Sequence, residues 1–233
     1  FWKNECTVPI RFYQKYPGWA QAGALLSRKM KTSISFCDLA HDGHSCNGIP
    51  IGISMVAAYS LEKFGGKIDA EIFKCPMDYI DYLERETPRI ACFSNYIWNL
   101  SLSYEIAARI KEQSPQTIIV FGGPNYPLDR EEQGAFLRAH PVIDFYVFRN
   151  GEVPFSLLFE TIENYEFDAQ ALKADKIAIP GCHYFSEGTF TGGKTVAALK
   201  ELDEIPSPYL TGLCDKFLAD EKHILQPLPQ TSF

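Results

Sequence analysis

The chain has 233 residues, of which 46% are hydrophobic and 22% charged, a composition typical of a soluble globular protein with a sizeable core. Its formal net charge of −7 argues against a general nucleic-acid binder, because phosphate binding requires a basic surface. No apolar run approaches the roughly 18–20 residues of a membrane span, and the first residues lack the pattern of a secretory signal. Neither nucleic acid nor membrane is therefore expected as a partner.

Residues 31–165 alternate between short apolar runs and helical patterns, which is typical of a parallel sheet covered on both faces. We expect strands at 33–37, 70–75, 90–94, 117–121 and 144–148. We expect helices at about 50–64, 77–86, 102–114, 130–140 and 155–162. The sequence therefore predicts an α/β fold, a doubly wound (flavodoxin-like) five-stranded parallel sheet in the order 2-1-3-4-5.

The two flanking segments have different patterns. Residues 1–30 predict a helical lead-in. Residues 166–233 combine short strands, glycine turns and the proline-spaced stretch ELDEIPSPY, which predicts a β-hairpin and a linker and no second core. The chain opens on Phe1 and ends on PLPQTSF, which suggests a fragment of a longer protein. Its seven cysteines have no metal-site or disulfide spacing, which favours a reducing cytoplasm.

In sheets of this kind a ligand binds at the carboxyl ends of the strands, near the point where the strand order reverses. The loops that reach this edge are 38–50, NYIWN (95–99), GGPNYP (122–127) and RNGEVP (149–154). Gly122 and Gly123 would let a ligand approach the backbone, or would form only a tight turn. Ser94 could bond a ligand or a local turn, and the pair Gly151 and Glu152 could hold a ligand amide or cap the last helix.

The loop AHDGHSCNGIPIG (40–52) contains four side chains of metal-ligand type, His41, Asp42, His44 and Cys46. A metal cluster here is not favoured, because one short loop would have to supply every ligand and no second cluster complements it. The glycine spacing also fails both phosphate-binding patterns, G-x-x-x-x-G-K-[ST] and G-x-G-x-x-G.

The order of these motifs resembles the cobalamin-binding N-terminal domain of cobalamin-dependent radical S-adenosylmethionine enzymes. The resemblance covers about residues 33 to 210, in the stretches GIPIGISMVAAYSLEKFG, ACFSNYIWNLSLSYEIAARIKEQSPQTIIVFGGPNYP and DFYVFRNGEVPFSLLFETI. The stretch IPGCHYFSEGTF, followed by ELDEIPSPY, is similar to the connector before the family's radical domain. Residues 31–165 are thus expected to be the cobalamin-binding domain, and 166–233 a hairpin and linker toward a radical domain.

The resemblance implies a cobalamin whose nucleotide tail runs beside the sheet. It implies that Ser94, Gly122 and Gly123 contact the tail. The residues that it places around the corrin are Asn95, Tyr96, Trp98, Pro124, Asn125, Gly151 and Glu152. A corrin is a large, flat, partly apolar ligand with amide edges, which suits aromatic walls and a few backbone hydrogen bonds.

Classical cobalamin domains ligate cobalt through a D-x-H-x-x-G motif, which many radical members lack, and here Asp42 and His44 occupy its first and third positions. The glycine comes one residue late, at Gly48, and Asn47 stands in its place. His44 is the candidate cobalt ligand, but the displaced glycine favours a loop that only shapes the floor of the pocket.

The C-x-x-x-C-x-x-C motif of the family's 4Fe–4S cluster does not occur in this chain. The resemblance therefore implies a cobalamin-binding module, not catalytic by itself, of a methyltransferase. Its radical S-adenosylmethionine domain, in the same chain, would hold S-adenosylmethionine and the cluster and act on an unidentified substrate. The alternative is a docking or substrate-covering domain that has lost cobalamin, with the Tyr96 and Trp98 rings in the corrin space. A flavin or nucleotide binder is less favoured, because the first loop lacks a phosphate-cradling pattern.

Overall fold

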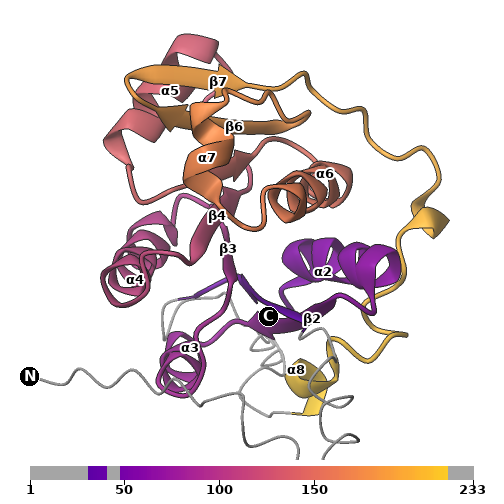
Figure 1. Cartoon of the computed structure of the whole chain (residues 1–233). Helices are drawn as coiled ribbons and strands as arrows, with labels where there is room; N and C mark the ends of the chain where they lie inside the picture. Colours follow the sequence, from indigo (N-terminus) through magenta and orange to yellow (C-terminus); the bar gives the residue numbers. More distant parts are fainter. Residues whose placement is uncertain (1–30, 41–47, 220–233) are drawn as a thin grey trace, which may run out of the picture. The chain divides into compact units, whose positions relative to one another are not determined.

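The computed structural model describes residues 31–40 and 48–219 (Figure 1). The predicted helical lead-in (1–30), the middle of the first loop (41–47) and the last residues (220–233) lie outside the described residues. A seven-stranded sheet runs in the order β2-β1-β3-β4-β5-β6-β7. The strands are β1 Thr32–Cys37, β2 Ile68–Phe73, β3 Ile90–Ser94, β4 Ile118–Gly122, β5 Phe145–Val147, β6 Cys182–Ser186 and β7 Thr189–Gly192.

The first five strands are parallel and follow the predicted order. The predicted number of strands is wrong, because the hairpin β6–β7 continues the sheet. Strand β6 pairs antiparallel with β5, with Val147 opposite Cys182. An uncovered β5 would leave a row of unpaired backbone N–H and C=O groups at the edge, and the hairpin satisfies them. The sheet is therefore mixed and the hairpin is part of the domain.

Helices cover both faces of the sheet (Figure 1). Their bounds are α2 Ile51–Phe64, α3 Pro76–Leu83, α4 Leu100–Gln113, α5 Arg130–Ala139, α6 Glu152–Asn164, α7 Ala169–Ala174 and α8 Asp215–Ala219. Helices α2 and α6 lie on one face, and α3, α4 and α5 lie on the other. Within the linker, Leu202–Glu204 form a single 3₁₀ turn. In the part of the chain that the structure describes, none of the helices has the length and apolar character needed to cross a bilayer.

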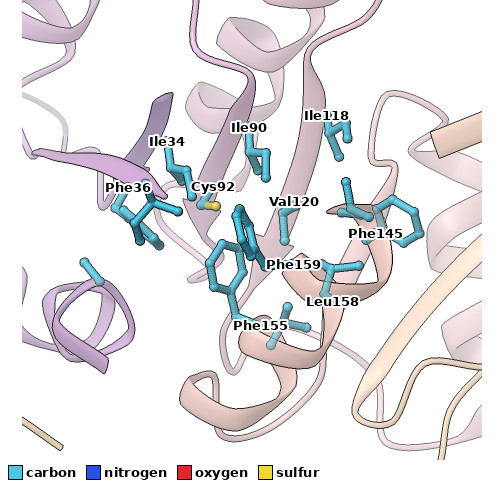
Figure 2. Close-up of a cluster of buried hydrophobic side chains, with 14 of the residues drawn as sticks. Ile34, Phe36, Ile90, Cys92, Ile118, Val120, Phe145, Phe155, Leu158 and Phe159 are labelled. Atoms are coloured by element: carbon cyan, nitrogen blue, oxygen red, sulfur yellow. The ribbon is translucent and has the colours of Figure 1, made fainter. Parts of the chain in front are cut away.

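The two faces of the sheet carry separate apolar clusters, because successive residues of a strand point to opposite sides. In β3, Ala91 and Phe93 face α4, whereas Cys92 faces α2 and α6. On the α2 and α6 side the cluster includes Cys92, Val120 and the ring of Phe155 (Figure 2). In β3 and β4 the residues nearest the carboxyl edge are thus small on this side, whereas the aromatic rings of Phe93 and Phe121 lie on the other.

Candidate functional site

A cavity of about 590 Å³ lies at the carboxyl ends of the parallel strands, between the sheet and the helices α2 and α6. Its floor includes Phe36, Cys92 and Val120, from β1, β3 and β4. Burial raises the pKa of the Cys92 thiol, so this floor stays uncharged and apolar. The cavity therefore occupies the place where sheets of this type bind ligands.

Helix α2 leaves this space open because the side chains that it buries near the cavity are small. Ser54 and Ala57 are fully buried, and the Ser54 hydroxyl donates to the Pro50 carbonyl at 2.7 Å. The larger residues Ile53 and Val56 are only half-buried, since they line the cavity. An amphipathic helix that packed fully against the sheet would bury these two side chains.

The turn after β4 forms one edge of the cavity and requires glycine. Gly123 has a φ of +131°, and a Cβ there would lie 2.6 Å from the backbone oxygen of Asn95. A side chain is therefore excluded both by the backbone conformation and by the space. The turn presents bare backbone to the cavity.

The side-chain amide of Asn95 holds this turn in place through hydrogen bonds. Its Nδ2 donates to the Asn125 carbonyl at 2.6 Å and to the Tyr146 hydroxyl at 3.0 Å. Its Oδ1 accepts from Asn125 Nδ2 at 3.0 Å. Asn95 is fully buried, so its side-chain amide joins the loops after β3 and β4.

Ser94 ends β3 at the cavity, and its hydroxyl donates to the Asp38 carboxylate. The Ser94 oxygen also accepts from Asn99 Nδ2 at 3.3 Å, while Asn99 Oδ1 accepts from the Tyr96 N–H at 2.8 Å. Lys74 Nζ lies 3.4 Å from the other Asp38 oxygen. This network holds the loops after β1, β2 and β3 together.

An aromatic rim stands beside the cavity. The rings of Tyr96 and Trp98 are stacked, with centroids 4.6 Å apart and planes within 6°. Tyr96 lines the cavity, and burial raises the pKa of its hydroxyl, which keeps it neutral. Trp98 is 52% exposed, and the neighbouring Ile97 is 81% exposed. The rim is unusually apolar for a water-facing loop, which is typical of a surface that a ligand or another domain covers.

The structure brings most of the sequence-predicted residues to this cavity. Those that line it are Ser94, Tyr96, Gly122, Gly123, Pro124, Gly151 and Glu152. Asn95 and Asn125 bond to each other, and Trp98 stacks on Tyr96 from outside the lining. His44 lies outside the described residues, as does the group of metal-ligand side chains around it.

Sequence reasoning missed the floor and the helical wall of the cavity. The sequence places Cys92 and Val120 on expected strands and Ile53 and Val56 on an expected helix, and nothing local marks them as cavity residues. The available signal was the alternation along the strands, which places Cys92 and Val120 two residues before Ser94 and Gly122, on one face. Tyr126 and Arg149 belong to loops that the sequence places at this edge, but neither they nor Phe148, which also line the cavity, were singled out as site residues.

Residues 46–159 match the family model described as the B12 binding domain. This match covers just under half of the chain. The chain is 30% identical over 132 residues to the cobalamin-dependent radical SAM methyltransferase TokK of Streptomyces tokunonensis. It is also 30% identical over 133 residues to 2-(S-pantetheinyl)-carbapenam-3-carboxylate methyltransferase of Streptantibioticus cattleyicolor. Each match spans 57% of this chain but only 18% of the relative.

Solved structures agree with this assignment at the level of the fold. The chain is similar to the cobalamin-dependent S-adenosylmethionine radical enzyme OxsB, in a structure with aqua-cobalamin and S-adenosylmethionine bound. The TM-score is 0.58 and the sequence identity 17%, over 80% of this chain and 25% of OxsB. The resemblance to the cobalamin-binding domains of cobalamin-dependent radical S-adenosylmethionine enzymes is thus confirmed.

Proposed function

We propose that this chain binds cobalamin, with the nucleotide tail in the cavity and the corrin across the strand ends. The observation that carries the proposal is the cavity of about 590 Å³ between the sheet and the helices α2 and α6. Its apolar floor suits the flat aromatic base of the tail, and the bare backbone at Gly122 and Gly123 allows close approach. The residues present therefore fit the cofactor.

The predicted site residues divide into two roles in this proposal. Ser94, Gly122 and Gly123 border the tail, and Tyr96, Pro124, Gly151 and Glu152 border the corrin edge. Asn95 and Asn125 hold the loops in place through their own hydrogen bonds, and Trp98 supports the Tyr96 ring. The domain thus orients the cofactor, and the cofactor carries the chemistry.

For the whole protein we propose a cobalamin-dependent radical S-adenosylmethionine methyltransferase, with the radical domain in the same chain as this module. The names of the two similar methyltransferases support this reading. S-adenosylmethionine and a 4Fe–4S cluster would belong to the radical domain. Bound cobalamin would supply the methyl group, and the described residues would hold it in place.

The alternative, a docking domain that has lost cobalamin, requires the Tyr96 and Trp98 rings to fill the corrin space. Instead the two rings stack on each other, and the cavity beside Tyr96 stays open. This geometry favours the cobalamin binder.

The proposal is tested by mixing the purified chain with hydroxocobalamin, desalting, and recording the visible spectrum. We expect corrin absorbance to stay with the folded protein at about one corrin per chain, and to be lost from a heat-unfolded control. A desalted, folded chain without corrin absorbance would contradict the proposal.

The displaced glycine in the first loop leads us to propose that His44 does not ligate cobalt. The visible spectra of the loaded wild type and of His44→Ala should then be the same. A wild-type spectrum of an imidazole-ligated corrin that disappears in His44→Ala would overturn this part of the proposal.

A further inference from the structure

Arg149 lies in the loop between β5 and α6 at the mouth of the cavity, and its side chain is exposed. Among the described lining residues, Arg149 is the only cation and Glu152 the only anion. The ion pairs found in residues 31–40 and 48–219 do not include Arg149. A cation at the mouth of an apolar cavity thus has no carboxylate partner among the described residues.

The local geometry keeps this guanidinium beside the cavity. Its central carbon lies over the Phe148 ring, 5.2 Å from the centroid, and Phe148 itself lines the cavity wall. Such a contact holds the cation at the ring face and leaves its N–H edges free to bond. Arg149 also has a φ of +68°, a conformation that costs a side chain of its size free energy and recurs at functional sites.

The chemistry of cobalamin provides an anion at this position. A phosphodiester with one negative charge joins the corrin side chain to the nucleotide, so it lies between the corrin and the buried base. With the base in the cavity and the corrin across the strand ends, the phosphodiester lies at the mouth. A guanidinium matches two phosphate oxygens with parallel N–H groups.

We propose that Arg149 binds the phosphodiester of the cobalamin tail, an inference that rests on the proposed function. The first N–H groups of α6, which has no side-chain cap at Gly151, add positive potential beside it, and the Glu152 carboxylate in the first turn offsets part of this potential. In an acidic protein of net charge −7, a single cation at the mouth selects a corrin that carries the phosphate over one that lacks it.

The test compares three corrins that differ at the tail: aquacobalamin, cobinamide phosphate, which lacks the base, and cobinamide, which lacks both phosphate and base. Their dissociation constants are measured by equilibrium dialysis with corrin absorbance, at low ionic strength. The proteins are the wild-type chain, Arg149→Gln, Arg149→Lys and Arg109→Gln. Arg109 is exposed on α4, on the other side of the sheet, and serves as the control.

We expect Arg149→Gln to weaken the binding of aquacobalamin and cobinamide phosphate by about 5- to 10-fold, which is the loss expected for a partly exposed charge-assisted hydrogen bond. The binding of cobinamide should not change. Arg149→Lys should recover part of the loss, and Arg109→Gln should bind as wild type. Raising the salt from about 0.02 M to about 0.3 M should weaken aquacobalamin binding more in the wild type than in Arg149→Gln.

An equal loss for all three corrins would overturn the proposal, because Arg149 would then support the loop or contact the corrin. Unchanged binding of aquacobalamin to Arg149→Gln would overturn it too, while leaving the proposed function intact. A wild-type chain that binds none of the three corrins would contradict the proposed function, and this inference with it.

Discussion

The hydroxyl group of Tyr146 donates a hydrogen bond of 3.0 Å to the carbonyl oxygen of Gly123. The same hydroxyl accepts from Asn95 Nδ2 at 3.0 Å. Burial raises the pKa of Tyr146 well above the pH range in which proteins fold, so the hydroxyl keeps its proton and remains a donor. Tyr146, which lies in β5, thus fixes the turn whose backbone borders the cavity.

We expect Tyr146→Phe to lower the free energy of unfolding by about 1–2 kcal/mol, because it leaves the Gly123 carbonyl without its partner. It should also weaken cobalamin binding several-fold, since the turn loses its support. Urea unfolding and corrin titration measure the two effects.

The matched control is Tyr184→Phe, which removes a 3.0 Å hydrogen bond to the Ile177 carbonyl, away from the cavity. It should lower stability by a similar amount and leave cobalamin binding unchanged. Equal losses of binding in the two variants would indicate that Tyr146 acts only through global stability.

Gly123→Ala introduces a Cβ at a φ of +131° and 2.6 Å from the backbone oxygen of Asn95. The expected cost is about 3 kcal/mol of unfolding free energy, from conformational strain and from the displacement of the Asn95 loop. Corrin retention after desalting should be abolished. Gly66→Ala is the control, because a Cβ at Gly66 meets no atom within 4 Å. Retention of cobalamin by Gly123→Ala would mean that the turn does not border the bound tail.

Ile53→Trp would place a large ring in the helical wall of the cavity. Aquacobalamin binding should fall more than about tenfold, because the ring takes the space of the tail, whereas cobinamide, which has no nucleotide, should bind as before. The control Leu102→Trp alters a half-buried residue of α4 on the other face of the sheet. A fall in the binding of both corrins would indicate that the nucleotide tail does not enter this cavity.

We expect the buried residue His183 to make the free energy of unfolding sensitive to acid. Its ring is 5% exposed in β6, Tyr126 lies within hydrogen-bond distance of its Nδ1, and burial together with the Arg130 charge lowers its pKa to about 4. An unfolded histidine titrates near 6.5, so the unfolded state takes up a proton first. Stability should be complete above about pH 6.5 and fall by about 3 kcal/mol as the pH is lowered to 4.

The measurement is the free energy of unfolding by urea at a series of pH values. Glutamine cannot titrate in this range, so the free energy of unfolding of His183→Gln should decrease less between pH 6.5 and 4 than that of the wild type. The control His140→Gln should show the same decrease as the wild type, because His183 is still present. An equal pH dependence in wild type and His183→Gln would assign the acid sensitivity to carboxylates.

The strands and the loops at their carboxyl ends could be predicted from the sequence, because their signals are local. Apolar β-branched runs such as TIIVF and the glycine pair that follows them depend on the intrinsic geometry of a few consecutive residues. The parallel order of the first five strands also follows from alternation with helices. The sequence by itself therefore determined the parallel strands and which loops lie at their carboxyl ends, around the cavity.

Only the tertiary structure decided what those loops enclose. Ile53 and Cys92 are apolar like any core residue, and they line a cavity only because α2 buries small side chains near it. The attachment of β6 to β5 likewise depends on backbone hydrogen bonds between distant segments, which no local pattern encodes. The sequence could not predict that Arg149 lacks a carboxylate partner among the described residues. Its neighbours in space come from distant parts of the chain, and only the folded structure brings them together.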